Sequence, residues 1–178
     1  GVWWPNCHPL LETLRLGAIA DLRENLAAST DPKALEARLA CMHAAWKSIW
    51  GLLSAKDVGF RLSHPLGHQI GARWDVPHGV TSCIVLPATA RFLHARSSEA
   101  QAKIARAMGL ESDEGAAPGI EAFLDALTIP RRLSETGAKR GEIPAVAEAV
   151  STELGYLGAP DADIATAAAL TDLLESVW

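Results

Sequence analysis

The sequence has few cysteines, and their positions argue against two kinds of site. Three occur among 178 residues, at Cys7, Cys41 and Cys83, and no two of them form a CxxC pair. This spacing suggests neither a disulfide framework nor a cysteine-rich metal site. A reducing compartment fits such a chain best, so we expect it to be cytoplasmic.

Clustered positive charge and long apolar runs are also lacking. The chain carries 16 Lys and Arg against 21 Asp and Glu, a net charge of -5, and its longest basic cluster is Arg131-Arg132. Phosphate binding relies on clustered Lys and Arg, so we expect no nucleic-acid partner. No apolar run approaches the about 18 residues of a membrane span, and no secretory signal is recognisable, so we expect no membrane partner either.

Patterns typical of sheets are absent as well. No stretch alternates apolar and polar residues for long enough to predict a strand, and no internal repeat is visible. No glycine-rich turn joins a strand to a helix in the way that binds dinucleotides. Hydrophobic residues make up 49% of the chain and alanine is abundant. We therefore predict an all-α fold, with residues 1–178 as a single domain.

Two amphipathic helices are expected before residue 54. The first has Pro9 in its first turn, and the second has Asp31 as N-cap and Pro32 as its first residue. Apolar side chains recur at helical spacing in both, and we predict that each stripe faces the core. The stripes are Leu10, Leu14, Ala18, Leu22 and Leu26 in the first helix, and Leu35, Leu39, Met42, Trp46, Ile49 and Leu53 in the second.

Further helices follow along the chain. One should run to about Trp74, and a very apolar one should start at Pro77 and be bent or broken by Pro87. The later ones are expected at 97–108, 119–126, 143–154 and from 159–161 to the C-terminus.

Three histidines stand at spacings that have a chemical meaning. His64 and His68 are four residues apart and would share one face of a helix, and His78 follows a short turn. A second helix could bring His78 back against His64. Two imidazoles make half of a site for iron or zinc, which takes about four protein ligands or three and a water. His43 is a weaker alternative ligand, because no second donor lies near it at ligand spacing.

Proline complicates the first of these ligands. Pro65 removes a backbone donor and disfavours helical geometry in the residue before it. We therefore expect His64 either to cap its helix or to lie at a kink.

The run HPLGHQIGARWDVPHGVTSCIVLP, from His64 to Pro87, resembles the signature of the iron-containing alcohol dehydrogenase family. That family is related to the maleylacetate reductases and, more distantly, to dehydroquinate synthase. The resemblance continues upstream through Asn6–Leu10, Leu35–Arg38 and Ala44–Trp46. It implies a multi-helix orthogonal bundle like the family's helical C-terminal domain.

The same resemblance implies roles for the three histidines. His64 and His78 would be metal ligands for Fe²⁺ or Zn²⁺, and His68 would face the nicotinamide and substrate as a catalytic residue. The family's other two ligands, an aspartate and a histidine, would lie before Gly1. NAD(P)H would be bound mainly by an N-terminal dinucleotide-binding α/β domain outside this chain. We therefore expect the chain to be inactive alone and to need that domain or a separate subunit.

The implied reaction is hydride transfer between an alcohol or carbonyl substrate and a nicotinamide cofactor. Histidine titrates near neutrality, so His68 suits the relay of the alcohol proton. Maleylacetate reductases typically carry THAVVLPH where this chain has TSCIVLPA, residues 81–88, which favours an alcohol dehydrogenase. A non-catalytic helical scaffold with a relict motif stays open as an alternative. Apolar surface near Trp3 and Trp4, left bare by a missing partner, would lead to dimerisation or poor solubility, and we expect a homodimer.

Overall fold

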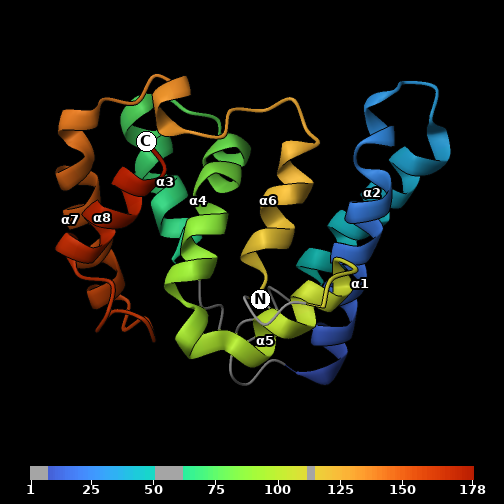
Figure 1. The fold of residues 1–178 in the computed structure, drawn as a ribbon, viewed down its shortest axis with the longest axis horizontal. Coiled ribbons are helices and arrows are strands. Elements are labelled where there is room, and N and C mark those ends of the chain that lie inside the picture. The colour runs from blue at the N-terminus through green and yellow to red at the C-terminus, as the bar shows by residue number, and fades with distance from the viewer. Residues whose placement is uncertain (1–7, 51–61, 112–114) are drawn as a thin grey trace. The chain divides into compact units, whose positions relative to one another are not determined.

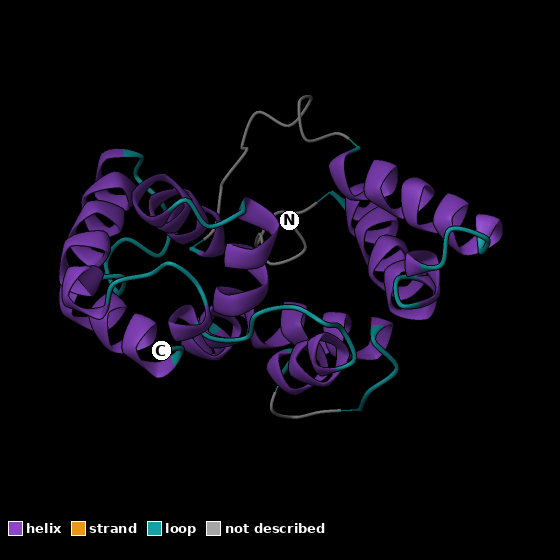
Figure 2. Cartoon of the chain, turned by 90° about the horizontal axis from the view of Figure 1, so that it is seen from above, coloured by secondary structure: helices purple, strands orange, loops and turns teal. Residues whose placement is uncertain are grey.

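The computed structural model describes residues 8–50, 62–111 and 115–178, and all regular elements in these ranges are helices (Figure 1). Figure 2 shows helices and connecting loops with no strand in the described part of the chain. The predicted all-α fold is therefore confirmed over these ranges. No helix in them is long and apolar enough to cross a membrane.

The chain forms two compact units. The first unit lies within residues 1–59 and 94–127 and contains α1 (Pro9–Asn25), η1 (Ala28–Thr30), α2 (Leu35–Ile49), α5 (His94–Ala107) and α6 (Ala117–Asp125). The second unit lies within residues 60–93 and 128–178 and contains α3 (Ser63–Trp74), α4 (His78–Phe92), η2 (Leu133–Glu135), η3 (Arg140–Glu142), α7 (Ile143–Tyr156) and α8 (Ala167–Ser176). The expectation of a single domain stays a prediction.

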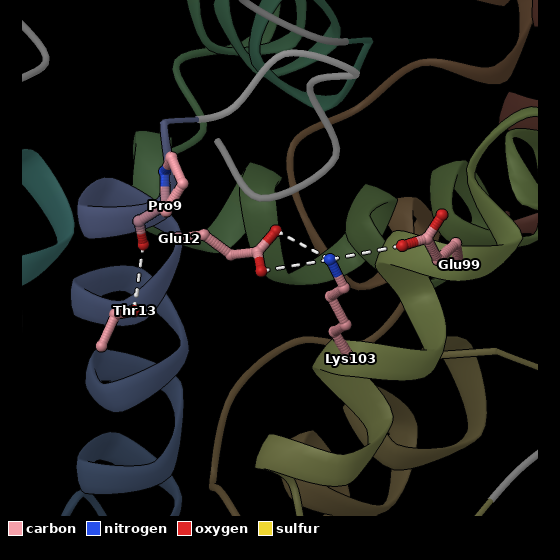
Figure 3. Close-up of polar contacts among 5 residues, drawn as sticks. All are labelled: Pro9, Glu12, Thr13, Glu99 and Lys103. Carbon is pink, nitrogen blue, oxygen red and sulfur yellow. Dashed lines mark hydrogen bonds and ion pairs between the residues drawn. The ribbon is translucent and has the colours of Figure 1, made fainter.

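In the first unit, α1 packs against both α2 and α5. Ion pairs join these helices: Lys47 Nζ lies 2.6 Å from Asp21 Oδ2 between α2 and α1. Lys103 of α5 lies 3.1 Å from Glu12 Oε2 of α1 and 3.4 Å from Glu99 Oε1 on its own helix (Figure 3). Pro9 begins α1 as predicted, and His8 caps it by accepting a hydrogen bond from the Leu10 N–H at 3.2 Å.

The structure corrects the sequence prediction for α2. Asp31 ends η1, and its Oδ1 accepts a hydrogen bond from the Lys33 N–H at 2.8 Å, which closes a turn before the helix. The apolar face of α2 that was predicted to face the core is exposed. The buried residue of α2 is Ala44, and the buried residue of α1 is Ala18. These small side chains allow two helices to approach closely. The exposed residues are Leu35 (71%), Leu39 (52%), Met42 (69%), Trp46 (53%) and Ile49 (60%); Leu53 lies outside the described residues.

In the second unit, an apolar core holds α3 and α4 in place. α3 packs against α4 and α7, while α8 packs against α7 and α4. A hydrogen bond from Trp74 Nε1 to Glu142 Oε2, 2.9 Å long, ties the end of α3 to η3. The fully buried side chains include Leu66, Ile70, Val85, Val146, Leu154, Leu170 and Leu174.

Two other boundaries differ from the prediction. α4 runs through the buried Pro87 without ending there, so Pro87 does not break the helix, and the bend stays a prediction. Proline costs the helix one hydrogen bond, and the packing of α4 on α3 and α8 offsets that loss. α8 begins at Ala167 rather than near residue 160, because Thr166 caps it by accepting from the Ala169 N–H at 3.3 Å.

Candidate metal centre

Helices α3 and α4 bring three histidines of the second unit together. His64 and His68 stand one turn apart in α3, and His78 is the first residue of α4. Between the helices, Asp75 adopts the left-handed conformation, with φ of 53° and ψ of 33°, and ends α3. This tight reversal returns His78 to the side of α3 that carries His64, as the spacing predicts.

The three imidazoles lie close enough to share one ligand. Their ring centroids are 4.0 Å apart for His64 and His68, and 5.2 Å apart for each of the two pairs that include His78. One nitrogen from each ring lies within 4.8 Å of the others. Across residues 8–50, 62–111 and 115–178, no other three His, Cys, Asp or Glu side chains meet in this way.

Pro65 is compatible with a helical His64. It is the third residue of α3, where backbone N–H groups have no partner within the helix in any case. His64 is thus part of the helix, one residue before a buried proline. The cap or kink that we considered for His64 is not needed.

Gly67 allows α3 and α4 to approach closely. A Cβ at this position would lie 2.9 Å from Thr81 Oγ1 and 3.2 Å from His78 Cε1. Thr81 is buried and donates a hydrogen bond to the His78 carbonyl oxygen at 2.8 Å. Gly67 and Thr81 therefore hold the start of α4 against α3 and fix where His78 lies.

Burial and neighbouring imidazoles set the charge of His64. Burial is the largest cause that lowers the pKa of His64. His68 and His78 lower this pKa further, and Glu153 raises it. Glu153 belongs to α7 and accepts a hydrogen bond from Gln69 Nε2 at 3.1 Å. A lowered pKa favours the neutral imidazole, which is the form that binds metal ions.

This donor set fits a divalent ion of the zinc or iron kind. Imidazole nitrogen suits both metals, and three protein ligands are the number that catalytic zinc sites use. His68 and His78 are exposed and His64 is half-buried, so the cluster opens to solvent on one side.

Other histidines do not join the cluster. His43 is exposed on α2 and His94 begins α5, and both belong to the first unit. Glu153, by contrast, is part of the surroundings of His64 and was not predicted. It lies far along the chain in an ordinary amphipathic helix, so no local pattern identifies it.

A family model and individual relatives point to the same protein family. The family model "Fe-containing alcohol dehydrogenase family, C-terminal" matches residues 2–178. The chain is 30% identical over 130 residues to lactaldehyde reductase of Escherichia coli K12, which covers 68% of this chain and 34% of that protein. It is 32% identical over 114 residues to maleylacetate reductase of Burkholderia cepacia, covering 61% of this chain and 32% of that one.

Solved structures share the fold. An iron-containing alcohol dehydrogenase from Corynebacterium glutamicum superposes with a TM-score of 0.80 at 24% identity, covering 99% of this chain and 47% of that one. A putative alcohol dehydrogenase from Ralstonia eutropha JMP134 gives 0.82 at 25% identity, covering 99% and 48%. The chain thus spans about a third of the length of these two curated relatives and just under half of the length of the two solved chains. It belongs to the Fe-containing alcohol dehydrogenase family, of which it carries the C-terminal domain.

Proposed function

We propose that this chain is the C-terminal part of a metal-dependent, NAD(P)-linked oxidoreductase that transfers a hydride between an alcohol or carbonyl substrate and the nicotinamide. The observation that carries the proposal is the cluster of His64, His68 and His78 where α3 meets α4, in a chain that matches the family over residues 2–178. Relatives at this level of similarity are named for the reduction or oxidation of small alcohols and carbonyl compounds.

In this proposal, His64 and His78 hold the metal ion from two packed helices. Fe²⁺ or Zn²⁺, when bound there, supplies a Lewis acid that polarises the substrate oxygen. Gly67 keeps the two ligands at a fixed separation, because it sets how closely α3 and α4 approach. The negative charge of Glu153 near His64 would favour the binding of a dication at the cluster.

His68 is assigned to proton transfer. It is exposed, stands one turn after His64, and its ring centroid lies 4.0 Å from that of His64. A histidine ring nitrogen can accept the alcohol proton near neutral pH and pass it to solvent. The hydride chemistry belongs to NAD(P)H, which we expect to be bound mainly by an N-terminal dinucleotide-binding domain.

The substrate class follows from the segment after His78. TSCIVLPA at residues 81–88 favours an alcohol dehydrogenase over a maleylacetate reductase, although relatives of both names match. Because the chain spans less than half of the solved relatives, we expect it to need an N-terminal domain or subunit for activity. A cytoplasmic homodimer stays our expectation, to be tested by sedimentation and fractionation.

A chimera tests this proposal. The N-terminal part of E. coli lactaldehyde reductase, which the match leaves uncovered, is joined to residues 1–178, loaded with Fe²⁺ or Zn²⁺, and assayed for NADH oxidation with small aldehydes. We expect activity that falls by about 10²-fold or more in His68→Ala, the scale of general acid–base catalysis. His43→Ala, on exposed α2, is the matched control and should retain activity.

A folded, metal-loaded chimera with no activity would contradict the proposal and favour the non-catalytic scaffold. Folding is checked by circular dichroism and metal content by elemental analysis, so that an inactive chimera can be interpreted.

A further inference from the structure

We propose that α2 is the surface through which two copies of this chain pair about a two-fold axis. The inference goes beyond the oxidoreductase chemistry of the proposed function: it rests on the homodimer expectation stated there and names the surface that forms the dimer. It needs neither the metal ion nor the hydride transfer, because every residue that carries it belongs to the first unit.

α1 and α2 lie side by side as an antiparallel pair (Figure 1). Lys47, late in α2, forms its ion pair with Asp21 of α1. Arg38, early in α2, donates a hydrogen bond to the Ser29 carbonyl oxygen in η1 at 3.5 Å. These contacts hold α2 along the first unit and leave its other side without them.

Small and large side chains occupy opposite sides of α2. Ala44 is buried, and Ala37 and Ala40, which share its side of the helix, are half-buried. The large apolar side chains of α2 stand on the opposite side, where they are open to solvent. A helix that packed on one neighbour alone would be expected to bury its large apolar side chains first.

We call this opposite side the α2 face. It consists of six large side chains that are each 47–71% exposed: Leu35, Leu39, Met42, Trp46, Ile49 and Trp50. The rings of Trp46 and Trp50 contact one another, with centroids 4.7 Å apart, so the end of the face is one continuous aromatic surface.

The area of the α2 face is large enough for a dimer. Large side chains bury about 150–250 Å² each, so these exposed fractions leave roughly 700 Å² of apolar surface. The largest apolar patch on a typical monomer measures about 300–600 Å². A stable protein–protein interface takes about 800 Å² from each partner, which the face and its margins supply.

The spacing of the α2 face favours a second copy as the occupant. Leu35, Leu39, Met42, Trp46 and Ile49 follow one another in steps of four, three, four and three residues. This is the heptad repeat by which apolar helices pack knobs into holes against helices of the same kind. The face therefore matches another copy of itself without requiring a different partner surface.

A two-fold axis follows from this self-complementarity. An isologous interface brings the same patch of both subunits together, and its central residue lies closest to the axis. Met42 is the middle residue of the repeat, so it meets Met42 of the second copy there. Two α1–α2 pairs joined in this way form a four-helix arrangement, and no charged side chain of the α2 face meets its like across the axis.

The short length of α2 limits the affinity. Its 15 residues provide about two heptads, and interfaces of ordinary size range from micromolar to tighter dissociation constants. We expect a reversible dimer with a Kd of about 1–100 μM. Below that concentration the chain is a monomer whose α2 face is open to solvent, as in the structure.

Sedimentation velocity on the 178-residue chain tests the inference, with concentrations from about 1 to about 300 μM that bracket the expected Kd. We expect a monomer–dimer equilibrium in the parent. Met42→Glu should raise the Kd at least about tenfold, because two carboxylates would meet at the axis. Tyr156→Glu is the matched control: it places the same charge on an exposed aromatic position of α7, in the second unit, and should dimerise like the parent. Circular dichroism checks that each variant folds.

A mixture of two variants provides a positive test. Met42→Lys should be as monomeric as Met42→Glu, since like charges again meet at the axis. An equimolar mixture of the two should recover the dimer, because opposite charges now face one another. A mixture that stays monomeric contradicts the pairing of α2 on α2.

The remaining outcomes separate this inference from the proposed function. A parent that is monomeric throughout, or a dimer that Met42→Glu does not weaken, overturns the inference. If the parent is monomeric and Met42→Glu lowers the activity of the lactaldehyde reductase chimera, an N-terminal domain covers the face; pairing is then overturned while the oxidoreductase proposal stands. A folded, metal-loaded chimera without activity overturns the oxidoreductase proposal, whatever the oligomeric state.

Discussion

At the scale of single residues, His64 shows how burial and neighbours act on one side chain. Its pKa lies below the ordinary value of 6.5, chiefly because of burial and then because of His68 and His78. The unfolded chain therefore binds a proton at His64 more tightly than the folded chain does. Folding stability should be unaffected by this group above pH 6.5 and should fall as the pH drops from 6.5 through the lowered folded pKa.

His64→Gln removes this pH dependence. We expect denaturant unfolding of the parent, measured with a chelator present, to lose stability on acidification below pH 6.5, and the variant to lose less over the same range. Equal slopes for the two proteins would show that His64 is not held in its neutral form. His43→Gln, an exposed histidine on α2, should behave like the parent.

Gly67 lies where α3 packs closely against the first turn of α4. Gly67→Ala gains up to about 1 kcal/mol of helix propensity but places a methyl group 2.9 Å from Thr81 Oγ1 and 3.2 Å from His78 Cε1. Overpacking of this kind costs about 1–3 kcal/mol. We expect the variant to be less stable in urea unfolding and to bind Zn²⁺ more weakly.

Gly79→Ala is the matched control, because no atom lies within 4 Å of a Cβ there. It should be as stable as the parent or slightly more so. If the two alanine variants have equal stability and equal metal affinity, the close contact at Gly67 does not position His78.

Residue spacing alone predicted which histidines meet, because four residues along a helix and a short turn leave few other arrangements. Spacing could not predict Glu153, which reaches the cluster from α7 only after the core has folded. Nor could spacing show how closely Gly67 lets α3 approach α4, since that depends on the distance between two helices.

At the scale of secondary-structure elements, α2 shows a limit of periodicity. Its apolar residues follow a helical stripe, and the sequence assigns that stripe to the core. In the structure the stripe is exposed, Ala44 is the buried residue of α2, and α2 packs against α1. Periodicity identifies an apolar face, but the partner that covers a face depends on tertiary packing.

Alanine substitutions distinguish the exposed stripe from the core. Leu66→Ala in α3 empties a fully buried position and should cost about 2–5 kcal/mol of unfolding free energy. Leu39→Ala in α2, where the side chain is 52% exposed, should cost less than about 1 kcal/mol. Guanidinium unfolding followed by circular dichroism measures both. A loss at Leu39 as large as that at Leu66 would contradict the exposure of this face.

Prolines explain two further differences between predicted and observed elements. Pro65 falls in the first turn of α3, where it breaks no hydrogen bond, and Pro87 lies inside α4, where packing maintains the helix. The sequence shows the proline but not the packing around it. Helix existence was thus predictable in most segments, and helix ends were less so.

At the scale of the whole molecule, the helical fold and the family were predictable from the signature between His64 and Pro87, and the family model and solved structures confirm both. The division into two units was not predictable, because residues 94–127 of the first unit separate the second unit's two segments, 60–93 and 128–178. Contacts between residues 60–93 and 128–178, such as the 3.1 Å hydrogen bond from Gln69 Nε2 to Glu153 Oε2, join the two segments of that unit. No local pattern encodes them.

The central proposal is that this C-terminal domain holds a divalent metal ion at the junction of α3 and α4. The most direct test is anomalous diffraction at the zinc edge from crystals grown with ZnCl₂. The account predicts one strong peak per chain, about 2.0–2.1 Å from a ring nitrogen of His64 and of His78. Absence of a peak there, or a single peak at another site, would contradict it.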